Sequence, residues 1–151
     1  MKDRYAATFF IVGAASVVAG GLVAAVSGPL GLVSGSWVAA YLVLVCGVAQ
    51  CAFGAAQGEF VRHPLTAAEF WIELLCWNLG SAAVIAGTLI REPIVVDIGG
   101  GLLVVALVLL MRNVTPSPTR RRALLWIYRA LIIALLVSIP IGLTLATIRA
   151  A

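Results

Sequence analysis

Charged side chains are scarce in this sequence of 151 residues. Only 11% of the residues are Asp, Glu, Lys or Arg, and Lys2 is the single lysine, whereas soluble globular domains use about 25%. Hydrophobic residues make up 63% of the chain, and the mean hydropathy is +1.14. No segment is polar enough to form a water-soluble domain. The composition therefore predicts an integral membrane protein.

Residues that bind metals or carry out redox chemistry are also few. His63 is the one histidine, and Cys46, Cys51 and Cys76 are the three cysteines, with no Cys-x-x-Cys spacing. One histidine could be a haem or metal ligand, but transition metals need several donors and no second histidine could complete a bis-His site, so this loop histidine is best interpreted as a surface residue. Cysteines inside apolar helices usually pack as small hydrophobic residues. We therefore expect no catalytic residue, no metal and no cofactor, and hence a protein that is not an enzyme.

Strict alternation of polar and apolar residues is absent, which argues against a membrane barrel. Backbone groups in hydrocarbon must be satisfied within the segment itself, so the long apolar runs predict helices. The sequence predicts an all-α, polytopic transmembrane bundle in a single integral membrane domain, 1–151, with five membrane-spanning helices. The expected spans are 6–26, 37–56, 67–90, 94–111 and 123–148.

The start of the third span and the whole of the fourth have distinctive sequences. Thr66, followed three residues later by Glu69, is typical of a capping box that satisfies free backbone N–H groups. The fourth span is only 18 residues long and contains Asp97 and Gly99-Gly100-Gly101. Glycines loosen a helix, so a broken or re-entrant segment is the alternative to a full crossing there.

The distribution of basic residues predicts the orientation. Lys and Arg accumulate in short cytoplasmic loops. With five crossings, seven basic residues share the side of the amino terminus and two, Arg91 and Arg149, lie opposite; the seven are Lys2, Arg4, Arg62, Arg112, Arg120, Arg121 and Arg122. If 94–111 did not cross, this balance would reverse. We therefore expect five crossings, a cytoplasmic amino terminus and an outside carboxyl terminus, in a cell membrane of the bacterial inner-membrane type.

The net charge of +4 and the pI near 9.4 do not indicate nucleic-acid binding, because no soluble module accompanies the basic residues. Arg112, Arg120, Arg121 and Arg122 form the expected cytoplasmic basic cluster. Anionic lipid headgroups attract such residues by roughly 1 kcal/mol each. The lipid bilayer is therefore their expected partner.

Polar residues inside the spans are the default functional candidates in a membrane protein. Gln50, Glu73 and Arg129 each lie about 10 Å from the expected cytoplasmic end of their helix, at about 1.5 Å per residue. This placement predicts a common intramembrane polar layer with a Glu73–Arg129 ion pair. The alternatives are a pair that only locks helix packing, or an Arg129 that snorkels alone to the interface. Asn78, deeper in the third span, is expected to bond a neighbouring helix.

Small residues at four-residue spacing predict faces on which helices pack closely. They occur in three spans: Ser16, Gly20 and Ala24; Gly47, Cys51 and Ala55; and Ser138, Gly142 and Ala146. Such faces can serve the bundle itself or an interface with another subunit.

Two functions fit this pattern. The favoured one is a noncatalytic accessory or assembly subunit that packs against other membrane protein subunits of a larger respiratory or transport complex. The alternative is a small transporter or binder of a lipophilic ligand such as a quinone. In that case the polar layer would anchor the ligand, and Gly99–Gly101 would form a flexible wall.

Overall fold

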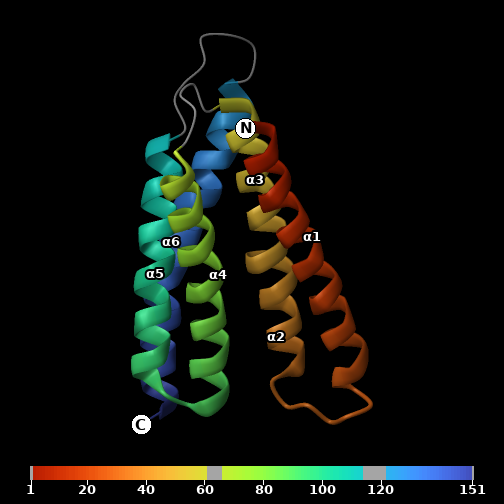
Figure 1. Ribbon diagram of the computed structural model, residues 1–151. Helices are drawn as coiled ribbons and strands as arrows, with labels where there is room; N and C mark the ends of the chain where they lie inside the picture. The colour runs from red at the N-terminus through yellow and green to blue at the C-terminus, as the bar shows by residue number, and fades with distance from the viewer. Residues whose placement is uncertain (1, 61–65, 114–121, 151) are drawn as a thin grey trace. The chain divides into compact units, whose positions relative to one another are not determined.

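A computed structural model describes residues 2–60, 66–113 and 122–150, and every regular element in these ranges is a helix. In chain order (Figure 1) the elements are α1 (Lys2–Ser27), α2 (Gly35–Tyr41), the π-helical segment η1 (Leu42–Ala49), α3 (Gln50–Phe60), α4 (Ala67–Ile90), α5 (Pro93–Asn113) and α6 (Arg122–Ala150). The second predicted span is formed by α2, η1 and α3 in continuous succession.

Five helical stretches are long and apolar enough to cross a membrane. They are Arg4–Ser27, Gly35–Phe60, Ala67–Ile90, Pro93–Asn113 and Leu125–Gly142. The all-α fold and the five predicted spans are therefore confirmed, with differences of a few residues at most helix ends. The chain is a multi-pass membrane protein.

The fourth span is an unbroken helix. α5 runs through Gly99, Gly100 and Gly101 without interruption, from Pro93 to Asn113. Proline suits the first position of a helix because its missing N–H would have no intrahelical partner there. The alternative of a broken helix, and with it a flexible glycine wall, is wrong for this segment.

The chain divides into an N-terminal unit, Met1–Gly58, and a C-terminal unit, Glu59–Ala151. Each is described by itself below. The single-domain organisation stays a prediction.

In the N-terminal unit, α1 pairs with the second span after a tight reversal. Gly31 takes a positive φ of 61° in this turn, a conformation that glycine adopts without steric cost. The Leu32 amide donates to the Ser27 carbonyl over 2.9 Å. The two spans lie side by side from this reversal onward (Figure 1).

Glycines bring these two spans into close backbone contact. A Cβ atom built on Gly13 would lie 2.9 Å from the Gly47 carbonyl oxygen, and one on Gly20 would lie 2.9 Å from the Ala39 carbonyl oxygen. The Cys51 thiol lies 3.7 Å from the Phe10 carbonyl oxygen. This close contact between α1 and the second span forms a seam that lies within the N-terminal unit.

The π-helical segment explains why this seam stays aligned. In an α-helix, residues four apart drift around the axis, because a turn takes only 3.6 residues. The wider turn of η1, with its i→i+5 hydrogen bonds, rotates less per residue and counters that drift. Ala39, Gly47 and Cys51 thereby all face α1. Ala24 and Ala55 are exposed, so they lie outside this internal contact, and their use in an interface with another subunit stays a prediction.

In the C-terminal unit, α4 and α5 form an antiparallel hairpin with defined ends (Figure 1). The capping box at Thr66 is confirmed: the Glu69 amide donates to Thr66 Oγ1 over 3.2 Å, and the Thr66 amide donates to Glu69 Oε2 over 2.9 Å. α4 ends at Ile90, and the next residue, Arg91, has a left-handed φ of 58° that reverses the chain into α5.

Glycines also bring α4 and α5 together. A Cβ atom on Gly99 would lie 2.7 Å from the Gly80 carbonyl oxygen and 2.8 Å from the Val84 nitrogen, and one on Gly87 would lie 2.8 Å from the Val96 nitrogen. Close backbone approach replaces the hydrophobic effect as a packing force in lipid. This seam was not among the predicted small-residue faces.

Candidate intramembrane polar site

Glu73 is fully buried, with 0% of its surface exposed, and its hydrogen bond crosses to α5. The side-chain amide of Asn113 donates to Glu73 Oε1 over 2.6 Å. A buried carboxyl group is costly unless it is hydrogen-bonded. The contact therefore ties the first part of α4 to the last residue of α5.

Helix geometry explains why these two side chains meet. Side chains lean toward the amino terminus of their helix. Glu73 therefore leans toward the start of α4, while Asn113 leans back along α5. The two helices are antiparallel, so the side chains converge from opposite directions. The carboxyl group consequently lies near the level where α5 ends.

Asn113 was not among the predicted members of the polar layer, because the expected span ended at 111, although it is the residue that bonds Glu73. The positions of the two residues relative to the turn between α4 and α5 could have indicated this contact. Glu73 precedes Arg91 by 18 residues and Asn113 follows Glu92 by 21. These distances from the turn differ by three residues, about 4.5 Å of helix, and residues at similar distances from the turn of an antiparallel hairpin lie at similar levels, so the spacing indicates proximity.

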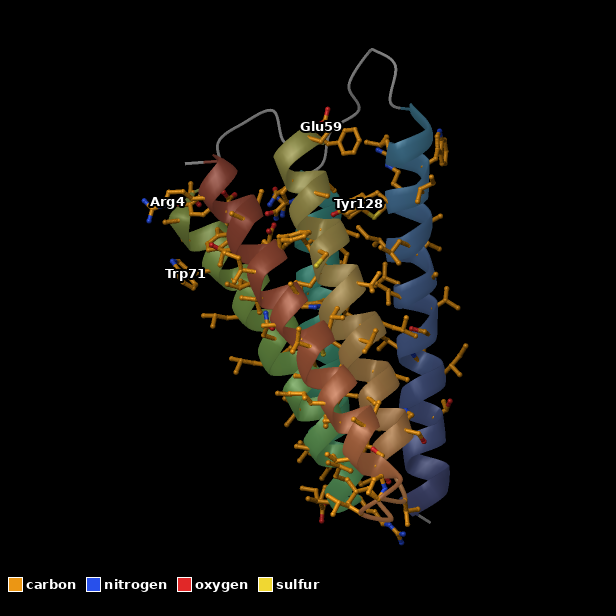
Figure 2. All side chains as sticks on the ribbon, turned by 90° about the vertical axis from the view of Figure 1, so that its right-hand side faces the viewer. Arg4, Glu59, Trp71 and Tyr128 are labelled. Atoms are coloured by element: carbon orange, nitrogen blue, oxygen red, sulfur yellow. The ribbon has the colours of Figure 1, made fainter. Side chains whose placement is uncertain are left out.

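Tyr128 adds α6 to the same end of the hairpin. Its hydroxyl donates to the Leu110 carbonyl over 3.2 Å, and the side chain is only 5% exposed. Leu110 is among the last four residues of α5, whose carbonyls lack an intrahelical partner. Tyr128, labelled in Figure 2, thus provides a hydrogen-bond donor to this carbonyl.

The other predicted members of the polar layer take different positions. Arg129 is half-buried, and its ion pair with Glu73 stays a prediction. The Asn78 amide donates to the Leu74 carbonyl in its own helix over 2.8 Å. The bond that the structure gives to Asn78 therefore lies within α4 rather than between helices.

Gln50 opens α3 in the N-terminal unit. It is 0% exposed, and neither Nε2 nor Oε1 has a hydrogen-bond partner among the residues that the structure describes. Membership of Gln50 in a layer with Glu73 and Arg129 stays a prediction, because the positions of the two units relative to one another are not determined.

The aromatic residues near the start of α4 and α6 divide into two kinds. Trp71 is 51% exposed and Trp126 is 64% exposed; Trp71 points away from α4 in Figure 2. Tryptophan at such positions is typical of the membrane interface. Trp77, 1% exposed, and Tyr128 are instead packed inside.

The basic cluster falls largely outside the described residues. Arg112 is exposed in the last turn of α5. Arg120 and Arg121 lie outside the described residues, and so does the side chain of Arg122, the first residue of α6. Within 2–60, 66–113 and 122–150, no group of three or more His, Cys, Asp or Glu residues could hold a metal ion. His63 lies outside these ranges.

Comparison with known proteins gives no relative: no family model, no curated protein and no solved structure matches the chain.

Proposed function

We propose that this multi-pass protein is a noncatalytic accessory or assembly subunit that packs against a larger respiratory or transport complex in the cell membrane. The observation that carries the proposal is a face of small residues on α6. Ser138 and Gly142 are exposed, and a Cβ atom built on Gly142 would meet nothing within 4 Å.

The internal seams indicate what such a face can do. Gly80 and Gly99 let two backbones approach until a single added methyl group would collide. Ser138 and Gly142 are similarly small, have the four-residue spacing of Gly47 and Cys51 in the N-terminal unit, and lie beside the exposed Val137 and Ile141. A lipid chain gains little from a glycine face, whereas a neighbouring helix gains van der Waals contact along it.

The polar site supports a structural role as well. The carboxyl group of Glu73 and the hydroxyl of Tyr128 are both engaged with α5. Groups used in this way fix helices to one another, which is the commoner function of polar residues in membrane bundles.

A photoreactive residue in place of Gly142 tests the proposal in living cells. We expect crosslinks to one or a few specific membrane proteins. The matched control is the same residue in place of Leu79, which is 58% exposed on a bulky face of α4 with Leu75 and Trp71. Equal crosslinking at both positions would argue against a dedicated face.

Native separation after gentle detergent extraction provides the second readout. The wild type should migrate with a large assembly. Gly142→Leu should migrate separately while keeping its fold, because the position is open within the protein. Migration of the wild type only as a free monomer or a homo-oligomer would contradict the proposal.

A further inference from the structure

The side-chain amide of Gln50 is the least satisfied buried group in the N-terminal unit. Both of its polar atoms lack a hydrogen-bond partner among the described residues, although none of the side chain is exposed. A primary amide offers two N–H donors and one acceptor oxygen. Leaving them unpaired in an apolar environment is costly, so the residue is better explained by a partner that comes from outside.

The helix α1 does not supply this partner. It packs against Gly47, Cys51 and Gly54, whereas Gln50 belongs to the adjacent stripe of the second span. The α1 hydroxyls of Thr8 and Ser16 donate to carbonyls of their own helix, over 2.9 and 3.0 Å. None of the described residues of the N-terminal unit therefore forms a hydrogen bond with the Gln50 amide.

The stripe around Gln50 is suited to a lipophilic molecule. Cys46 and Phe53, four residues before and three after Gln50, share its face and are buried. A polarizable thiol and an aromatic ring provide apolar contact on either side of one polar group, which is the usual composition of a small-molecule site. The amide also directly follows η1, and π-helical segments occur frequently at functional sites.

We propose that Gln50 is the polar anchor of a binding site for a lipophilic molecule that carries a carbonyl oxygen. The amide nitrogen donates a hydrogen bond to that oxygen, and Cys46 and Phe53 contact the apolar part beside it. Two sources supply this chemistry: a quinone dissolved in the membrane, or the ester carbonyl of a bilayer lipid. The inference is independent of the accessory role, since it rests on a different unit of the chain.

The first arm tests the quinone. The purified full-length chain is placed in nanodiscs of ether-linked lipids, which contain no ester carbonyl, and titrated with a short-tailed benzoquinone while tryptophan fluorescence is followed. We expect saturable binding that Gln50→Leu weakens by at least about tenfold, the equivalent of roughly one hydrogen bond. Asn78→Leu, which removes an amide already bonded within its own helix, should bind like the wild type.

The second arm tests the bilayer lipid. Without quinone, the wild type should unfold at a higher temperature in ester-linked than in ether-linked nanodiscs if a lipid carbonyl occupies the site, and Gln50→Leu should abolish the difference. Binding in either arm that depends on Gln50 supports the proposal and names the source. The absence of a Gln50-dependent effect in both arms would overturn it.

A stability measurement separates this role from internal packing. In ether-linked nanodiscs without quinone, Gln50→Leu should unfold at the same or a higher temperature than the wild type, because it removes an unsatisfied amide. A lower unfolding temperature would mean that the protein itself satisfies the amide, and the proposal would then be wrong.

Discussion

At the scale of single residues, the contact between Glu73 and Asn113 is the most informative. Sequence reasoning identified Glu73, because a carboxylate inside an apolar run is unusual. It did not identify Asn113, because an amide beside an arginine at the end of a run resembles an ordinary loop residue. Only the hairpin geometry brings the two together at 2.6 Å.

Asn113→Leu removes the donor and leaves the buried carboxyl group without this partner. We expect a loss of about 1.5–3 kcal/mol in the free energy of unfolding, the range for hydrogen bonds to charged groups. The measurement is a denaturant titration in mild detergent. Asn78→Leu is the control, and it should cost less because its bond lies within one helix. Equal losses in the free energy of unfolding for the two substitutions would show that the interhelical bond stabilises the protein no more than the bond within α4.

Arg91 adopts a left-handed backbone conformation at the end of α4, with φ of 58°. Residues with a Cβ atom pay roughly 1–2 kcal/mol in that region, whereas glycine does not. We expect Arg91→Gly to raise the free energy of unfolding by up to about 1 kcal/mol, since the flexible unfolded chain offsets part of the gain. Arg91→Ala keeps the Cβ atom and serves as the control. A destabilised glycine variant would mean that the arginine side chain contributes more than the backbone costs.

At the scale of helices, the two hairpins depend on glycine rather than on bulky side chains. The four-residue spacing in the sequence indicated small-residue faces that contain Gly20 and Gly47, but not that these two faces pack against each other. It did not indicate the seam of Gly80, Gly87 and Gly99, because the partner of each glycine lies on another helix and the spacing within one helix is irregular. The sequence did not indicate the π-helical segment either, because neither a proline nor an obvious insertion marks it.

Gly99 and Gly101 provide a matched test of the seam in one helix. Gly99→Ala places a Cβ atom 2.7 Å from the Gly80 carbonyl oxygen, whereas Gly101→Ala meets nothing within 4 Å. Overpacking typically costs about 1–3 kcal/mol. We expect Gly99→Ala to destabilise the protein by this amount in a detergent unfolding titration. Gly101→Ala should be neutral or stabilising, because alanine favours the helix.

If both alanine variants unfolded alike, α4 and α5 would not approach as closely as the structure has them. Gly87→Ala offers an independent check on the same seam, because its Cβ atom would lie 2.8 Å from the Val96 nitrogen. It should behave like Gly99→Ala.

At the scale of the whole molecule, the number of spans was the most predictable property. Hydrocarbon leaves the backbone no alternative to a helix, so length and hydropathy alone suffice. Even the glycine-rich fourth span is a continuous helix. This agrees with the charge distribution, which predicted five crossings. Function was far less predictable, because no catalytic motif is present and the contacts that matter depend on pairing between helices.

Five crossings also separate the loops into two sets. The loop before α6, with Arg120 and Arg121, should lie in the cytoplasm, and the two turns at Ser34 and Glu92 should lie outside. The interpretation that the basic cluster contacts anionic lipid headgroups depends on this assignment.

Cysteine labelling in intact cells tests the five-span orientation directly. In a background with Cys46, Cys51 and Cys76 replaced, single cysteines are introduced at Ser34, Glu92 and Thr119 and exposed to a membrane-impermeant maleimide. We predict labelling at Ser34 and Glu92 from the exterior, and at Thr119 only after the cells are opened. Labelling of Thr119 and Glu92 from the same side would contradict a fourth crossing, and labelling of Thr119 in intact cells would contradict the orientation.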